Sequence, residues 1–245
     1  MRAILFPGQG SQKLGMLAES YAASDLIQHH FNQANSALGY DLWQVVQEDE
    51  AKLNQTQYTQ PAILTASVAL WHWAQHQGFD SASVAYMAGH SLGEYSALVC
   101  AQSIDFEDAV QLVAKRGELM QSSVESSEGA MAVILGMEDD VVNAVCSEVA
   151  QNEVVTPVNF NCPGQVVIAG QRSAVERAID QAKEQGARRA QMLPVSVPSH
   201  CALMEPAAAA FAQVLEGIRV EIPKVPVLQN ATLDVHTNPD DIKQA

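Results

Sequence analysis

A serine between two glycines, directly after an apolar run, is the feature that most constrains this chain. The run SVAYMA spans residues 83–88, and the turn that follows reads GHSLG over residues 89–93. Glycine on both sides of Ser91 is typical of a turn too tight for ordinary side chains, which projects its central side chain instead of packing it. The stretch predicts a strand, a sharp turn and a helix that present the Ser91 hydroxyl as a nucleophile. An ordinary turn serine is the alternative.

Composition limits the class of protein. The 245 residues are 48% hydrophobic and 17% charged, which is typical of a globular chain with a sizeable core. The formal net charge of −15 argues against nucleic acid or an anionic membrane as a partner, because both require a basic face. With no membrane-length apolar run and no signal-peptide pattern, we expect a cytoplasmic protein. The cysteines lack metal-binding spacing, so we expect buried free thiols and no metal site.

Strand and helix signals alternate along the chain, which favours an α/β fold with a mostly parallel sheet. A helix is expected over residues 61–77, with Pro61 in its first turn and Gly78 after its end. From residue 128 the order becomes β-α-β-β-α-β, the ferredoxin-like pattern. Its expected elements are strands at 130–137, 154–160, 165–170 and 187–194, and helices at 138–150 and 173–186.

These signals predict two parts. A discontinuous, hydrolase-like catalytic core is expected over residues 1–127 and 194–245, with a further strand at 225–232. A small ferredoxin-like subdomain is expected as an insert over residues 128–193.

A serine nucleophile needs a general base, and one histidine stands apart from the others. His200 lies in the proline-punctuated loop VPVSVPSH, and loop residues held by a scaffold often carry function. We expect His90 to support the turn or line the pocket instead of transferring a proton. Solvated helix faces are expected for the four histidines in helical context, which are His29, His30, His72 and His76.

Two backbone amides and one arginine complete the predicted site. The amide of Leu92, which follows the nucleophile, and the amide of Gln9, in the glycine-rich loop FPGQGSQ, are expected to bind an oxyanion. Arg116 lies among apolar helix positions, where an unpaired guanidinium is costly, so a carboxylate partner is expected. That partner is either a substrate carboxylate or an internal Asp or Glu.

Five motifs, in order, resemble those of the bacterial malonyl-CoA:acyl carrier protein transacylases of type II fatty acid synthesis. They are FPGQGSQ, GHSLGEYSAL, AKRGELMQ, NFNCPGQVVIAG and LPVSVPSHCALM. The resemblance implies a ping-pong transfer in which Ser91 takes a malonyl group from coenzyme A and passes it to the thiol of acyl carrier protein. It also implies that His200 relays the proton, Arg116 grips the malonyl carboxylate and Asn161 lines the pocket. A coenzyme A thioester is then the substrate, and no permanently bound cofactor is expected.

Two alternatives remain open at the level of the sequence. A serine thioesterase or esterase needs the same nucleophile and base, and an inactive carrier-protein binding module keeps the same motifs. We further expect Arg188 and Arg189 to receive the acidic carrier protein, and we expect a monomer.

The resembled family continues past the position that matches Ala245. In that family a backbone carbonyl of the continuing segment accepts a hydrogen bond from the catalytic histidine. We therefore expect a longer version of the chain to be more active and more stable than these 245 residues.

Overall fold

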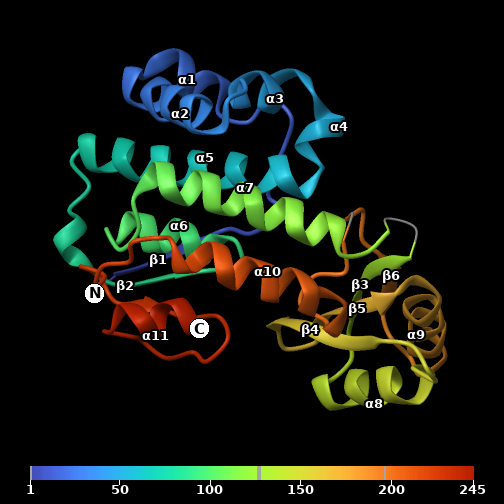
Figure 1. The fold of residues 1–245 in the computed structure, drawn as a ribbon. Coiled ribbons are helices and arrows are strands. Elements are labelled where there is room, and N and C mark those ends of the chain that lie inside the picture. Colours follow the sequence, from blue (N-terminus) through green and yellow to red (C-terminus); the bar gives the residue numbers. More distant parts are fainter. Residues whose placement is uncertain (1, 126–127, 196) are drawn as a thin grey trace. The chain divides into compact units, whose positions relative to one another are not determined.

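The computed structural model describes residues 2–125, 128–195 and 197–245 (Figure 1). The chain divides into a larger unit, Met1–Gly117 with Phe211–Ala245, and a smaller unit, Glu118–Ala210. Each unit is described by itself below. The smaller unit contains the predicted subdomain, whose boundaries remain a prediction; the expected boundary at residue 127 lies outside the described residues.

The larger unit is built on a parallel sheet. Its described strands follow the order β1-β2-β7, with β1 at Arg2–Phe6, β2 at Val84–Gly89 and β7 at Val227–Leu228. Helix α6 (Gly93–Cys100) packs on β1 and β2, and α5 (Thr56–His76) packs on α6 (Figure 1). The other helices of this unit are α1 (Ala18–Ala23), α2 (Asp25–Leu38), α3 (Leu42–Glu48), α4 (Glu50–Leu53) and α11 (Pro239–Gln244), with a 3₁₀ turn, η1, at Ser81–Ser83.

Helix α5 is the buried centre of this unit. Apolar residues such as Leu64 and Val68 are fully buried on it, because α2 packs on one side and α6 on the other. The predicted start at Pro61 is wrong: the helix begins at Thr56, and Pro61 lies inside it. A proline at that point removes one helical hydrogen bond, and the packing of the preceding turn against the rest of the unit offsets this cost.

The opposite face of the parallel sheet is partly open. Leu5 is 78% exposed and Tyr86 is 43% exposed. A cavity of about 380 Å³ lies beside β1 and α5, with apolar walls that include Ile4, Leu70 and Trp71. None of the predicted site residues lines it.

The smaller unit contains an antiparallel sheet whose described strands follow the order β4-β5-β3-β6. This is the ferredoxin-like order, with one helix after the first strand and one after the third. The elements are β3 (Gly129–Leu135), α8 (Asp139–Val149), β4 (Val155–Cys162), β5 (Gln165–Gln171), α9 (Arg172–Glu184), β6 (Arg189–Met192) and the 3₁₀ turn η2 (Ala202–Met204). The predicted α/β class, with a parallel sheet and a ferredoxin-like part, is confirmed.

One face of the antiparallel sheet is covered by α8 and α9. Val142 and Ala178 on these helices pack with Ile134 and Ile168 of the sheet in a buried core. Pro157 is accommodated because β4 pairs only with β5 and is an edge strand, where a missing N–H leaves no ladder bond unmade. Helices α7 (Phe106–Ser122) and α10 (Glu205–Glu216) each run from one unit into the other.

Three details differ from the sequence predictions. Cys162 is exposed, whereas the other cysteines are buried as expected. The strand expected at 225–232 is limited to Val227–Leu228, and the residues after it form a turn. Arg188 precedes β6 instead of lying within it.

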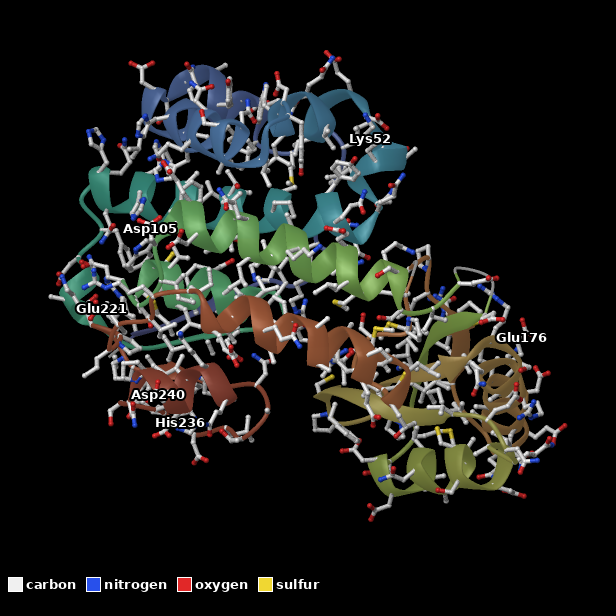
Figure 2. The ribbon with its side chains drawn as sticks, viewed as in Figure 1. Lys52, Asp105, Glu176, Glu221, His236 and Asp240 are labelled. Atoms are coloured by element: carbon white, nitrogen blue, oxygen red, sulfur yellow. The ribbon has the colours of Figure 1, made fainter. Side chains whose placement is uncertain are left out.

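The negative charge lies on the surface of both units. Asp105, Glu176, Glu221 and Asp240 are all exposed and carry their carboxylates outward (Figure 2). No helix within the described residues combines the length and the apolarity needed to cross a membrane.

Two helical histidines are paired inside the larger unit, so the prediction that they lie on solvated faces is wrong. His30 is 5% exposed; its Nδ1 lies 2.8 Å from the Leu26 carbonyl oxygen and its Nε2 lies 2.7 Å from Nδ1 of His72. A carbonyl only accepts, so His30 Nδ1 carries the proton and His72 Nδ1–H donates to His30 Nε2. Burial lowers the pKa of both imidazoles below the usual 6.5. The bond to the Leu26 carbonyl opposes this shift at His30, whereas the neighbouring His29 lowers the pKa of His30 further and His30 lowers that of His72.

This pair predicts a loss of stability in acid. Because the folded pKa values are lowered, the unfolded chain binds more protons below pH 6.5, and the stabilisation present above that pH is lost as the pH falls. The free energy of unfolding, measured with denaturant between pH 7 and pH 5, should fall by up to about 1.4 kcal/mol per pH unit for each histidine. The double variant His30→Phe, His72→Leu should reduce the dependence of the free energy of unfolding on pH. The control variant His76→Gln, on the same helix as His72, should leave this dependence unchanged. An equal slope in the double variant would contradict the assignment.

Candidate active site

Ser91 lies at the point where β2 turns sharply into α6. Its φ is +50°, a left-handed conformation that non-glycine residues rarely adopt. A Cβ on Gly89 would lie 1.8 Å from the carbonyl carbon of Gly93, and one on Gly93 would lie 2.2 Å from the Phe6 carbonyl oxygen. The two glycines are therefore required because the backbone passes this close to itself and to the end of β1. Such a strained serine is typical of a nucleophile elbow.

The loop after β1 lies directly against this elbow. The His90 amide donates to the Phe6 carbonyl oxygen at 3.0 Å, and a Cβ on Gly8 would lie 2.3 Å from the His90 carbonyl oxygen and 2.9 Å from its Nδ1. His90 therefore packs on the loop with both its backbone and its ring. This contact agrees with the supporting role predicted for His90.

Two amides near Ser91 have no acceptor within the described chain. These are the N–H groups of Leu92, the N-cap residue of α6, and of Gln9, in the loop after β1. The Gln9 side chain ties that loop to α5 through a bond from its Nε2 to Thr56 Oγ1, at 3.2 Å. Amides held in this way can receive an oxyanion on the acyl group of a serine ester, as the sequence predicts for both residues.

Arg116 is brought to the serine by a close crossing of α5 and α7. A Cβ on Gly117 would lie 2.6 Å from the Thr56 carbonyl oxygen and from the Gln57 Cα, so only glycine permits this approach. The neighbouring Arg116 then donates from Nη1 to Oε1 of the fully buried Gln60 at 2.9 Å and from Nη2 to Ser91 Oγ at 3.4 Å. The guanidinium is therefore fixed beside the nucleophile.

The internal carboxylate considered for Arg116 is absent. None of the ion pairs in the described part of the chain includes Arg116. Its Cζ instead lies 5.7 Å from the centroid of the Tyr95 ring. A neutral amide and an aromatic face hold the guanidinium but leave its charge unneutralised, as a site for an anionic substrate group requires.

The remaining predicted residues belong to the smaller unit. His200 is exposed in a turn with a φ of +66°, a constrained position for a side chain with a functional role. Asn161 is exposed at a bulge of β4, where the pairing shifts between Phe160 and Cys162. Arg188 and Arg189 are exposed next to each other at the start of β6. The pairing of His200 with Ser91 remains a prediction from the sequence.

Sequence reasoning missed Asn230 and Glu94. Asn230 follows β7, its side chain accepts from the Ser91 amide at 3.1 Å, and its backbone N–H donates to Glu94 Oε2 at 2.7 Å. The glutamate directly after GHSLG was the available signal, because it lies in the first turn of α6, three residues from the nucleophile.

Comparison with known proteins agrees with this geometry. Residues 4–243 match the acyl transferase domain family. The malonyl CoA-acyl carrier protein transacylase of Escherichia coli O157:H7 is 55% identical over 245 residues, which are 99% of this chain and 78% of that protein. The transacylase of Bacillus subtilis is 43% identical over 244 residues, with 99% and 76% covered.

Solved structures give the same relationship. An acyl carrier protein S-malonyltransferase from Vibrio cholerae superposes with a TM-score of 0.93 at 53% identity, covering 99% of this chain and 79% of that one. A malonyl-transacylase in complex with a type II PKS acyl-carrier protein gives 0.96 at 53% identity, with 99% and 78% covered. The chain belongs to the acyl transferase domain family, and within it to the malonyl CoA-acyl carrier protein transacylases.

Proposed function

We propose that this protein transfers a malonyl group from malonyl-CoA to the phosphopantetheine thiol of acyl carrier protein. The observation that carries the proposal is the position of Arg116, whose Nη2 lies 3.4 Å from Ser91 Oγ and which has no ion-pair partner among the described residues. In a malonyl thioester the carboxylate is separated from the reacting carbonyl by a single methylene group. An arginine that binds this carboxylate must therefore lie next to the nucleophile.

The transfer proceeds in two balanced halves. Ser91 Oγ loses its proton to His200 and attacks the thioester carbonyl, and the Leu92 and Gln9 amides stabilise the oxyanion. The carbon–sulfur bond breaks, the coenzyme A thiolate takes the proton from His200, and a malonyl-serine ester remains. The carrier protein thiol then attacks this ester with the same proton relay in reverse. Asn161 and His90 line the acyl pocket in this proposal.

The alternatives differ in what happens to the ester. A thioesterase or esterase would admit water to it, and a binding module would not form it. The Arg116 guanidinium, whose charge is not neutralised by an ion pair, favours a charged acyl group over the neutral chain of a lipid ester. The relatives also favour transfer, because those compared above are named as transacylases or transferases. No resident cofactor is needed for any step, and we propose the cytoplasm as the location.

Acyl uptake from radiolabelled malonyl-CoA tests the proposal directly. Label bound to the protein and then passed to added carrier protein is expected; release as free malonate indicates a hydrolase, and absence of label indicates a binding module. Ser91→Ala should abolish labelling, and His200→Ala should slow it on the order of 10²-fold, as loss of a positioned base does. Undiminished labelling of the Ser91 variant would overturn the assignment.

Arg116 predicts the choice of acyl group. Arg116→Ala should raise KM for malonyl-CoA and relatively favour acetyl-CoA, since the half-buried arginine is left without an ion-pair partner beside a neutral acyl group, at a cost below the roughly 3 to 5 kcal/mol of a fully buried charge. The matched control is Arg219→Ala in the same unit, whose guanidinium is paired with Glu221 at the surface. Steady-state kinetics with both thioesters measure the preference. A malonyl preference that survives in Arg116→Ala would assign the arginine a structural role.

Arg188 and Arg189 are proposed to contact the carrier protein. Both are exposed, and Arg189 Nε donates to Gln191 Oε1 at 2.8 Å, which holds the side chain along the strand. Reversing both to Glu should lower the association rate with acidic carrier protein steeply at low salt and leave malonyl uptake from coenzyme A unchanged. The control is Arg172→Glu plus Arg177→Glu on α9 of the same unit. An unaltered association rate would contradict a role of Arg188 and Arg189 in binding the carrier protein.

A further inference from the structure

Asn230 makes four hydrogen bonds at the elbow, two to its backbone and two to the Glu94 carboxylate. Asn230 Oδ1 accepts from the Ser91 amide at 3.1 Å, and Asn230 Nδ2 donates to the Gly89 carbonyl oxygen and, at 2.7 Å, to Glu94 Oε2. The Asn230 amide donates to the same Glu94 oxygen, also at 2.7 Å. From this arrangement we infer that Asn230 and Glu94 are positioning residues, which together hold the strained backbone of Ser91 in its reactive conformation.

The glutamate decides which way the asparagine points. A carboxylate only accepts, and so does the Gly89 carbonyl, so both must face the NH₂ group of Asn230. This leaves Oδ1 as the atom that faces the Ser91 N–H. If the side-chain amide were flipped, Oδ1 would face two other acceptors, the Gly89 carbonyl oxygen and Glu94 Oε2. The NH₂ group would then face the Ser91 N–H, which is another donor. Glu94 thus fixes the orientation of Asn230, and Asn230 fixes Ser91.

Asn230 and Glu94, together called the brace below, act at a strained point of the chain. The φ of +50° at Ser91 is unfavourable for a residue with a Cβ, so the backbone is held there by its surroundings. The glycines permit the close approach but do not bond the Ser91 amide; Asn230 does. It also occupies that amide, so the N–H of Leu92 is the one that the elbow presents to an oxyanion. Without the brace, the hydroxyl and the Leu92 amide would lose their fixed relation.

The inference rests on the proposed function, and its test separates the two. The rate of Ser91 modification is measured as acylation by malonyl-CoA and, independently, as phosphonylation by a fluorophosphonate probe, in which the serine oxygen displaces fluoride from phosphorus. Asn230→Ala should lower both rates on the order of 10- to 100-fold, the cost of a small misplacement of reacting groups, with KM for malonyl-CoA unchanged. Asn238→Ala is the matched control, since its side chain caps α11 in the same C-terminal segment without touching the elbow. It should leave both rates unchanged.

A second variant gives a signature that a packing role does not. Asn230→Asp replaces the NH₂ donor with a carboxylate that faces the Glu94 carboxylate. A hydrogen bond between the two side chains forms again only when one of the carboxylates is protonated. The ratio of variant to wild-type acylation rate should therefore rise as the pH is lowered from 8 to 6. A ratio independent of pH, or an Asn230→Ala variant acylated at the wild-type rate, would overturn the brace. If the wild type reacts with the fluorophosphonate but not with malonyl-CoA, the proposed function fails.

Discussion

The chemistry of the larger unit depends on a close contact of its backbone with itself. Gly93, the first residue of α6, lies so near the end of β1 that a single added methyl would overlap the Phe6 carbonyl oxygen, and a methyl on Gly89 would overlap Gly93. This contact brings the loop that carries Gln9 against the turn that carries Ser91. It also forces Ser91 into a left-handed conformation. The elbow therefore presents the Ser91 hydroxyl and the Leu92 amide, and the loop against it carries the second candidate oxyanion amide, that of Gln9.

A second close contact supplies specificity. Gly117 lets α7 approach the first turn of α5, so Arg116 reaches both Gln60 and Ser91. The fully buried Gln60 orients the guanidinium without neutralising it, which an acidic residue would have done. The same nucleophile could serve esters of many kinds. In the proposed function, the unneutralised positive charge of Arg116 beside Ser91 selects an acyl group that ends in a carboxylate.

Local patterns predicted the features that depend on neighbouring residues. GHSLG predicted the elbow, and the order of strand and helix signals predicted the ferredoxin-like part. Both depend on glycine sterics and side-chain periodicity, which act within a few residues. Features decided by distant packing were not predictable. The start of α5 at Thr56 depends on its tertiary packing, the His30–His72 pair depends on how α2 meets α5, and Asn230 bonds an amide 139 residues away. Each of these lies between elements whose approach no local pattern records.

The most direct test of the proposed mechanism is to identify the residue that carries the acyl group. The protein is quenched during reaction with malonyl-CoA, digested, and its peptides are sequenced by mass spectrometry. We expect a malonyl ester on the peptide that contains GHSLGE, with the added mass on Ser91 and a stability typical of an oxygen ester. A malonyl group found instead as a thioester on the exposed Cys162, or on any residue other than Ser91, would contradict it.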